Sequence, residues 1–398
     1  MQNRIFSSFK WPLLVIFLVT QACQAQPEGS IHGKVTMEQG WKPVVYLVHP
    51  RQFSEVASDY LGEIVDSAQV ASDGTLAFHY VPKVAGADLY FLTMQREGSR
   101  FATHLDDSDP ASANYMPVVI DATHPIHFTA ASSTFQQSFT LESPLSDNMA
   151  LLSLSDIRRT ALRAYLTQQA QREDNDTLLL EHEKEFLGYA NSLIQFADST
   201  SSMYSAMVAI RWISIAGDYE RFPEFIYRQC KKWSSTSPDH PLVAGLCQAT
   251  KAGVLPVMMG DVLPDYKLPM VDGDTLSVKQ LLGKKLTIVD IWASWCAPCR
   301  KENRTVLVPL WDRYNTKGLQ IIGYSIDIDK NAWQNAILKD GAAWTHASHL
   351  TGDETPFLQT LRITTIPANY ILDEAGKVVA KNVYGEDLQK LVMAYLEK

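Results

Sequence analysis

The chain has 398 residues, a length that predicts two or three domains rather than one. Hydrophobic residues make up 46% and charged residues 20%, which excludes extensive disorder and allows real cores. The formal net charge is −9, and so acidic a chain lacks the cationic surface that nucleic-acid phosphates require. Five cysteines are too few for a disulfide-built scaffold, so each must be interpreted individually.

Residues 1–25 have the composition of a secretory signal peptide. Two basic residues precede an apolar run over 11–19 that is too short to span a bilayer comfortably. Cys23 follows Thr-Gln-Ala, which resembles a relaxed bacterial lipobox, so lipidation of Cys23 is predicted. The alternative is ordinary cleavage near Ala25, with loss of Cys23. In either case we expect an exported protein of the bacterial periplasm or cell envelope, where thiols meet an oxidising compartment.

Residues 29–140 predict an antiparallel β-sandwich-like domain. Short runs rich in β-formers are separated by turn signals such as Asp73-Gly74. Several strands at such spacing are typical of two packed sheets. The expected strands are 31–36, 44–49, 63–70, 75–81, 88–94, 117–120 and 126–129.

Residues 145–255 change to a helical period. Apolar residues between Phe186 and Ala197 recur with the spacing of one buried helix face, and further apolar helices are expected over 203–215 and 222–233. Cys230 and Cys247 fall in this region. They either form a structural disulfide or remain two buried free thiols, because connectivity cannot be read from sequence.

Residues 256–398 alternate strand and helix, which predicts an α/β domain. The order is a strand–helix–strand unit followed by two strands and a helix. The expected strands are 286–293, 319–326, 370–372 and 378–381, and the expected helices are 298–314, 330–339 and 384–397.

The chemistry of the chain is concentrated at Cys296 and Cys299. Cys296 falls where the apolar strand 286–293 gives way to a helix. The unpaired backbone N–H groups and the dipole of a helix start stabilise a thiolate, and the thiolate is the nucleophile. Cys299 lies one helical turn further, within reach of Cys296, so it can resolve a mixed disulfide. Pro298 is tolerated in the first helical turn.

Trp-Cys-Ala-Pro-Cys after an apolar strand resembles the active site of the thioredoxin superfamily. The lead-in 263–268 with Asp272-Gly273-Asp274 and the insertion 331–353 are similar to its secreted TlpA/ResA-like, AhpC/TSA-related redoxin branch. The pattern of residues 64–67 and 73–78 is similar to an N-terminal β domain on secreted thioredoxin-like proteins of Bacteroidetes. The main resemblance covers residues 256–398 and implies a thioredoxin fold there.

The resemblance implies a cis-proline loop facing the active cysteine, which Thr365-Ile366-Pro367 fits. In the family this loop lends its backbone to the incoming peptide strand. Trp295, Ala297 and Pro298 would then line the client-facing surface together with Thr365 and Ile366.

Asp290 interrupts the apolar strand six residues before Cys296. A buried carboxylate is costly, and it resembles the buried aspartate that helps to deprotonate the resolving cysteine in thioredoxins. Burial would raise its pKa towards neutrality, as suits a general base. The alternative is a salt bridge or an edge position. Glu302 is expected to complement the helix dipole, with a place beside the site as the alternative.

Other interpretations of the cysteines are weaker. One Cys-x-x-Cys pair is a poor zinc site, and we expect His346 and His349 to be solvated. Haem attachment needs a histidine where Arg300 stands. The predicted function is therefore a thiol-disulfide oxidoreductase that acts on client protein disulfides. The resemblance implies a reductant, whereas the residues themselves leave the direction of electron flow open. Such an enzyme needs no metal or organic cofactor, and the resemblance implies a membrane electron donor. The alternative is a binding protein in which residues 29–255 hold a partner and the thioredoxin-like body is a passenger.

Overall fold

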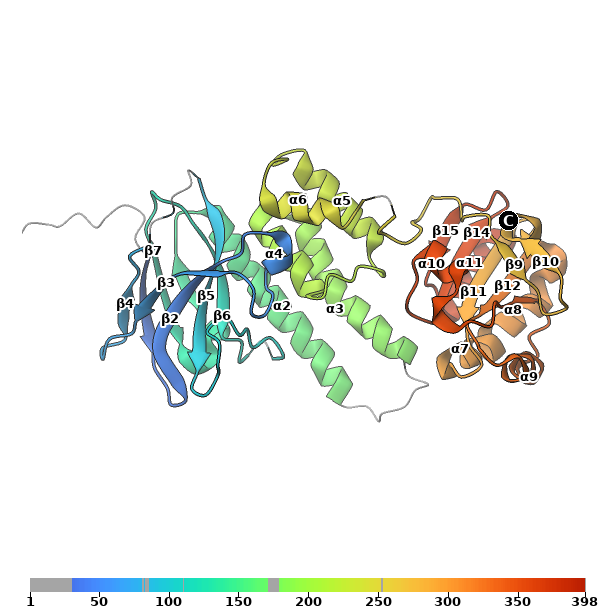
Figure 1. Ribbon diagram of the computed structural model, residues 1–398, viewed down its shortest axis with the longest axis horizontal. Coiled ribbons are helices and arrows are strands. Elements are labelled where there is room, and N and C mark those ends of the chain that lie inside the picture. The colour runs from blue at the N-terminus through green and yellow to red at the C-terminus, as the bar shows by residue number, and fades with distance from the viewer. Residues whose placement is uncertain are drawn as a thin grey trace, which may run out of the picture.

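The computed structural model describes residues 31–80, 82, 86–109, 111–170, 179–251 and 253–397. The predicted signal peptide, with Cys23, lies outside these residues. Figure 1 shows three bodies in a row, which are a β body, a group of helices and an α/β body. No helix among the described residues has the length and apolar character needed to cross a membrane.

The β body consists of two four-stranded sheets, with the strand orders β4-β1-β7-β8 and β3-β2-β5-β6. Apolar side chains from both sheets, such as Ile31, Val45 and Phe128, form one shared core. The strands are β1 (Ile31–Thr36), β2 (Trp41–His49), β3 (Glu63–Gln69), β4 (Thr75–Ala77), β5 (Asp88–Arg96), β6 (Tyr115–Ile120), β7 (Ile126–Ala131) and β8 (Thr140–Glu142).

One strand pairing departs from the predicted antiparallel arrangement. β1 and β7 pair in parallel, with Ile31 opposite Ile126. Parallel neighbours require a long connection between them, because a tight hairpin can only join antiparallel strands. Here the chain builds the whole second sheet between β1 and β7, a topology that the local patterns of single strands do not reveal.

The helices share a core with the second sheet. β5 is buried on both faces, with Tyr90 and Leu92 towards the first sheet and Leu89 and Phe91 towards the helices. A strand covered on both sides is apolar almost throughout, as the sequence of β5 is. The helices are α1 (Phe135–Ser138) beside β7, then α2 (Ser146–Ala170), α3 (Leu179–Ser199), α4 (Met203–Ile213), α5 (Pro223–Ser234) and α6 (Pro241–Gln248).

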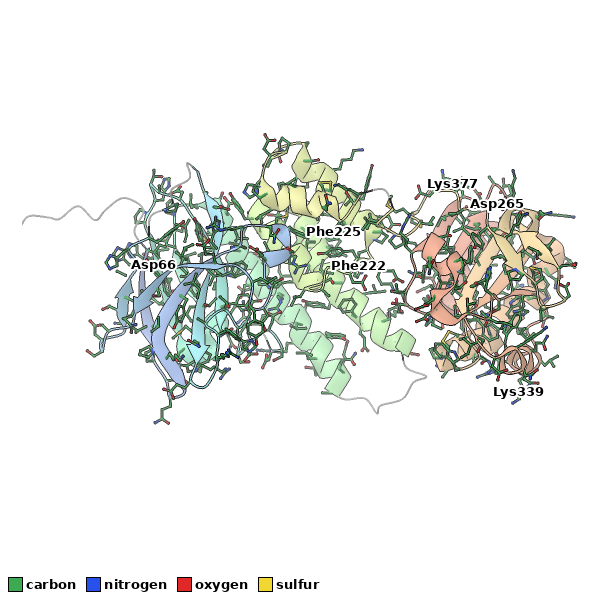
Figure 2. All side chains as sticks on the ribbon, viewed as in Figure 1. Asp66, Phe222, Phe225, Asp265, Lys339 and Lys377 are labelled. Atoms are coloured by element: carbon green, nitrogen blue, oxygen red, sulfur yellow. A yellow bond between two sulfur atoms is a disulfide. The ribbon has the colours of Figure 1, made fainter. Side chains whose placement is uncertain are left out.

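A disulfide joins Cys230 on α5 to Cys247 on α6, which decides between the two alternatives left open by the sequence. Figure 2 places Phe222 and Phe225 among these helices, and both side chains are buried. The start of α5 is therefore anchored by its aromatic residues, and its second half is anchored by the disulfide.

The α/β body is built on a five-stranded sheet in the order β13-β12-β11-β14-β15. β11, β12 and β13 are parallel, whereas β14 and β15 are antiparallel additions. The elements are the hairpin β9 (Lys267–Pro269) and β10 (Thr275–Ser277), then β11 (Leu286–Trp292), α7 (Ala297–Glu302), α8 (Val308–Tyr314), β12 (Leu319–Ser325), α9 (Lys330–Asp340), β13 (Thr345–Ala347), α10 (Pro356–Leu361), β14 (Ala368–Asp373), β15 (Val378–Lys381) and α11 (Gly385–Leu396).

The central strand β11 is fully buried and has a core on each face. The helix predicted over 298–314 is α7 and α8 joined by a π-helical stretch, Asn303–Leu307. Pro309, in the first turn of α8, has no N–H to donate, and the wider turn lies just before it. The cysteines lie where the chain passes from the carboxyl end of β11 to the start of α7.

Candidate active site

Cys296 and Cys299 form a disulfide at the start of α7. Cys296 is the N-cap residue, and its Sγ accepts a hydrogen bond from the Cys299 N–H at 3.3 Å. Both residues are buried, with exposed fractions of 5% and 2%. A sulfur at this position faces the free N–H groups of the first helical turn, which favour the thiolate over the thiol.

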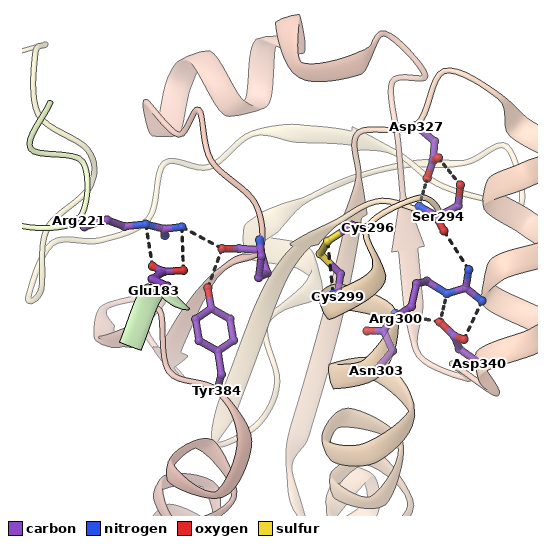
Figure 3. Close-up of a disulfide and its surroundings, with 11 residues drawn as sticks. Glu183, Arg221, Ser294, Cys296, Cys299, Arg300, Asn303, Asp327, Asp340 and Tyr384 are labelled. Atoms are coloured by element: carbon purple, nitrogen blue, oxygen red, sulfur yellow. Dashed lines mark hydrogen bonds and ion pairs between the residues drawn. A yellow bond between two sulfur atoms is a disulfide. The ribbon is translucent and has the colours of Figure 1, made fainter. Parts of the chain in front are cut away.

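The loop before Cys296 is held at Ser294 by hydrogen bonds to Asp327 and Arg300 (Figure 3). The carboxylate of Asp327 accepts bonds from the Ser294 N–H at 2.9 Å and from the Ser294 hydroxyl at 2.6 Å. Arg300 donates to the Ser294 carbonyl oxygen at 3.0 Å. These contacts fix the approach of the chain to the first cysteine.

Arg300 is itself bound to Asp340 at the end of α9 (Figure 3). The Asp340 side chain is fully buried, and Arg304 also binds it, at 2.8 Å. Burial alone would raise the pKa of Asp340, but the bonds from Arg300 and Arg304 lower it below its usual range. Sequence reasoning missed this cluster. The signal for it was weak, namely two arginines spaced four apart on one helix face.

Asp290 lies in the middle of β11, opposite Asn369 of β14 and Gly323 of β12. Its exposed fraction is 5%, and burial, together with the nearby charge of Glu302, raises its pKa to about 8. No salt bridge to its carboxylate is found among the residues that the structure describes. The alternative of an edge position is excluded, because β11 is the central strand.

Glu302 is not at the helix start but at the end of α7, where it is buried. Its Oε1 accepts a hydrogen bond from the Gly385 N–H at 2.8 Å, and burial raises its pKa. The dipole role expected for it is therefore wrong, because Glu302 lies beyond the first turn of the helix and its carboxylate bonds to Gly385 instead of the free N–H groups at the helix start. The alternative, a place near the site, fits its effect on the pKa of Asp290.

The Ile366–Pro367 peptide bond is cis. The Pro367 carbonyl oxygen accepts bonds from the Tyr384 hydroxyl at 2.8 Å and from Arg221 at 3.3 Å (Figure 3). Pro367 is buried and Thr365 is exposed, whereas Ile366 is half-buried. Among the described residues, the N–H and carbonyl groups of Ile366 form no hydrogen bond.

Two large apolar side chains are exposed on the loops that meet at Ser294 and Asp327. Trp295, next to Cys296, is 66% exposed, and Ile328, in the loop after β12, is 76% exposed. Ala297 is half-buried, but Pro298, expected at the client-facing surface, is buried at the second position of α7.

His346, expected to be solvated, is buried in the sheet. It lies in the short strand β13, where its Nε2 is 3.0 Å from the Ala342 carbonyl oxygen and burial lowers its pKa to about 4. The sequence did not show this strand because it is only three residues long.

Residues 258–392 match the Redoxin family. The chain is 27% identical over 142 residues to the thiol-disulfide oxidoreductase ResA of Bacillus cereus, an alignment that covers 36% of this chain and 79% of that protein. It is 26% identical to the ResA of Bacillus thuringiensis over the same shares of both chains. A solved thiol-disulfide oxidoreductase from Bacteroides fragilis is 28% identical, covering 34% of this chain and 98% of its own, with a TM-score of 0.31.

The C-terminal body is thus a Redoxin domain with thiol-disulfide oxidoreductase homologues. The prediction of a thioredoxin-like enzyme of this type is confirmed.

Proposed function

We propose that this protein is an exported reductant of protein disulfides, in which Cys296 is the nucleophile and Cys299 resolves the mixed disulfide. The observation that carries the proposal is the position of Cys296 as N-cap of α7, with its sulfur bonded to the Cys299 N–H. Asp290 acts as the proton acceptor for Cys299, and Pro367 holds the loop on which the client segment rests.

The reaction balances without a further cofactor. The Cys296 thiolate attacks one sulfur of a client disulfide, and the other client sulfur leaves as a thiolate that takes up a proton. Asp290 accepts the proton of Cys299, whose sulfur then attacks Cys296 and releases the second client thiol. The protein ends as the Cys296–Cys299 disulfide, the state present in the structure, and two electrons have passed to the client.

Such a cycle outside the cytoplasm needs a donor that reduces the Cys296–Cys299 disulfide again. We therefore propose a membrane protein as electron donor and protein disulfides as clients. Lipidation of Cys23 would keep the enzyme close to that donor. This arrangement requires neither a metal nor an organic cofactor.

The reduction potential of the Cys296–Cys299 pair tests the proposal. The mature protein is equilibrated with dithiol and disulfide buffers, and its redox state is read by thiol alkylation. A value near or below about −230 mV supports a reductant, whereas a value near about −120 mV indicates an oxidant of client thiols. A pair that never equilibrates contradicts both and supports a binding protein with a thioredoxin-like passenger. Cys230→Ser/Cys247→Ser is a useful companion, because it leaves one disulfide to report.

A further inference from the structure

One short segment of the helical body reaches the proline loop of the α/β body. This segment, Tyr219–Glu224, has the sequence Tyr-Glu-Arg-Phe-Pro-Glu and leads into α5. Its aromatic residues Tyr219 and Phe222 are buried in the core that the helices share with the β body. Its charged residues Glu220, Arg221 and Glu224 bond to the α/β body instead. The segment therefore links the buried core of the helical body to the α/β body.

Glu220 accepts hydrogen bonds from the first part of the proline loop. Its carboxylate accepts bonds from the Thr364 N–H at 2.9 Å, the Thr364 hydroxyl at 2.5 Å and the Thr365 N–H at 3.3 Å. Thr364 and Thr365 are exposed, and no other partner for these donors is found in the described part of the chain. Without Glu220 the two residues would be held only by water.

Arg221 donates a hydrogen bond to the other end of the loop. It donates to the Pro367 carbonyl oxygen at 3.3 Å, and its own direction is fixed by Glu183 of α3, whose Oε1 lies 2.9 Å from the arginine Nε (Figure 3). Both side chains of this ion pair are mostly buried. The residue left between the two contacts is Ile366, whose main-chain groups have no partner among the described residues.

We propose that Glu220 and Arg221 belong to the client-binding site as positioning residues, which hold the proline loop open for an extended client polypeptide at Ile366. The inference rests on the proposed function and adds the residues that position its client strand. A loop fixed beforehand loses less entropy when a strand pairs with it, so its ordering favours binding. A small disulfide, which forms no strand, gains nothing from this ordering.

The experiment compares two substrates in the full-length mature protein, with dithiothreitol as the electron source. Insulin is the polypeptide disulfide and oxidised glutathione is the small one. We expect Glu220→Ala to raise the KM for insulin roughly ten- to hundred-fold, as misplaced substrate-positioning groups do. Turnover of oxidised glutathione and the reduction potential are expected to stay within two-fold of the wild type.

Two control variants separate the positioning of the proline loop from two other effects, which are the contact between the two bodies and the folding of the helices. Glu224→Gln weakens the contact with Lys381 on β15, 2.8 Å away, without touching the proline loop, so its KM for insulin should not change. Arg228→Ala, in the middle of α5, removes an exposed ion pair with Asp198 of α3 and tests the helical fold alone. If Glu220→Ala does not fold, Glu220→Gln replaces it, with a smaller rise in KM in the same direction.

The outcomes distinguish this inference from the proposed function. A wild-type protein that reduces neither substrate overturns the proposed function and this inference with it. A wild type that reduces both, with Glu220→Ala lowering both rates equally or neither, overturns the inference alone. Faster insulin reduction by Glu220→Ala also overturns it, because the segment would then obstruct the client instead of positioning its binding loop.

Discussion

Replacement of Asp290 by asparagine is expected to remove a pH-dependent loss of stability. In the folded protein Asp290 keeps its proton up to about pH 8, because burial and Glu302 raise its pKa, whereas its unperturbed value is 3.8. Between these values the folded state binds more protons than the unfolded chain, so the free energy of unfolding falls as the pH rises. The neutral asparagine has no such dependence.

The size of the effect follows from the two pKa values. Each unit corresponds to about 1.36 kcal/mol, so the three units between 3.8 and pH 7 give about 4 kcal/mol. Between pH 4 and pH 7 we expect the free energy of unfolding of the wild type to fall by about 4 kcal/mol more than that of the variant. A fixed cost of burying the amide would shift the whole curve of the variant but not its slope.

Urea unfolding of the oxidised proteins at pH 4, 5.5, 7 and 8.5 measures this difference. Asp387→Asn on α11 is the matched control, since it makes the same change of side chain at a position that is 68% exposed. Parallel stability curves for Asp290→Asn and the wild type would refute the assignment of a raised pKa. The same variant should slow release of the mixed disulfide roughly a hundred-fold at pH 8.5, where the Asp290 carboxylate is ionised and can accept the Cys299 proton, as loss of a general base does.

Three further predictions concern the cysteines and the Arg300 cluster. Cys299→Ser should accumulate a mixed disulfide between Cys296 and a client, which is visible on a non-reducing gel. Cys296→Ser should form no such adduct, and adducts in both variants would contradict the assigned roles. The Cys230–Cys247 disulfide joins residues 17 positions apart, and its removal should lower the free energy of unfolding by about 3 kcal/mol. An unchanged urea midpoint would argue against this. Asp340→Asn should cost roughly 3–5 kcal/mol by leaving two arginines without their buried partner, and a loss below 1 kcal/mol would show that Arg300 and Arg304 find other partners. The stability that Asp340 supplies is present above its usual carboxyl pKa and should be lost only as the pH falls below it.

The sequence by itself determined the local features of this protein. The apolar run of β11 and the Cys-Ala-Pro-Cys motif were enough to place a strand, a helix start and a dithiol, because each depends only on neighbouring residues. Asp290 could be singled out for the same reason, as a carboxylate inside an apolar strand. The body boundaries near residues 140 and 256 followed from the change in hydrophobic period.

The tertiary structure alone decided which distant residues meet. The parallel pairing of β1 with β7, the burial of His346 beside β12 and the bond between Cys230 and Cys247 all join residues that are not neighbours in the chain. The sequence of one strand or helix does not show which other element it will pack against. The same holds for Glu220. On the sequence it is one acidic residue between the helices expected over 203–215 and 222–233, and only the packing of its aromatic neighbours turns it towards Thr364 and Thr365, 144 and 145 residues away.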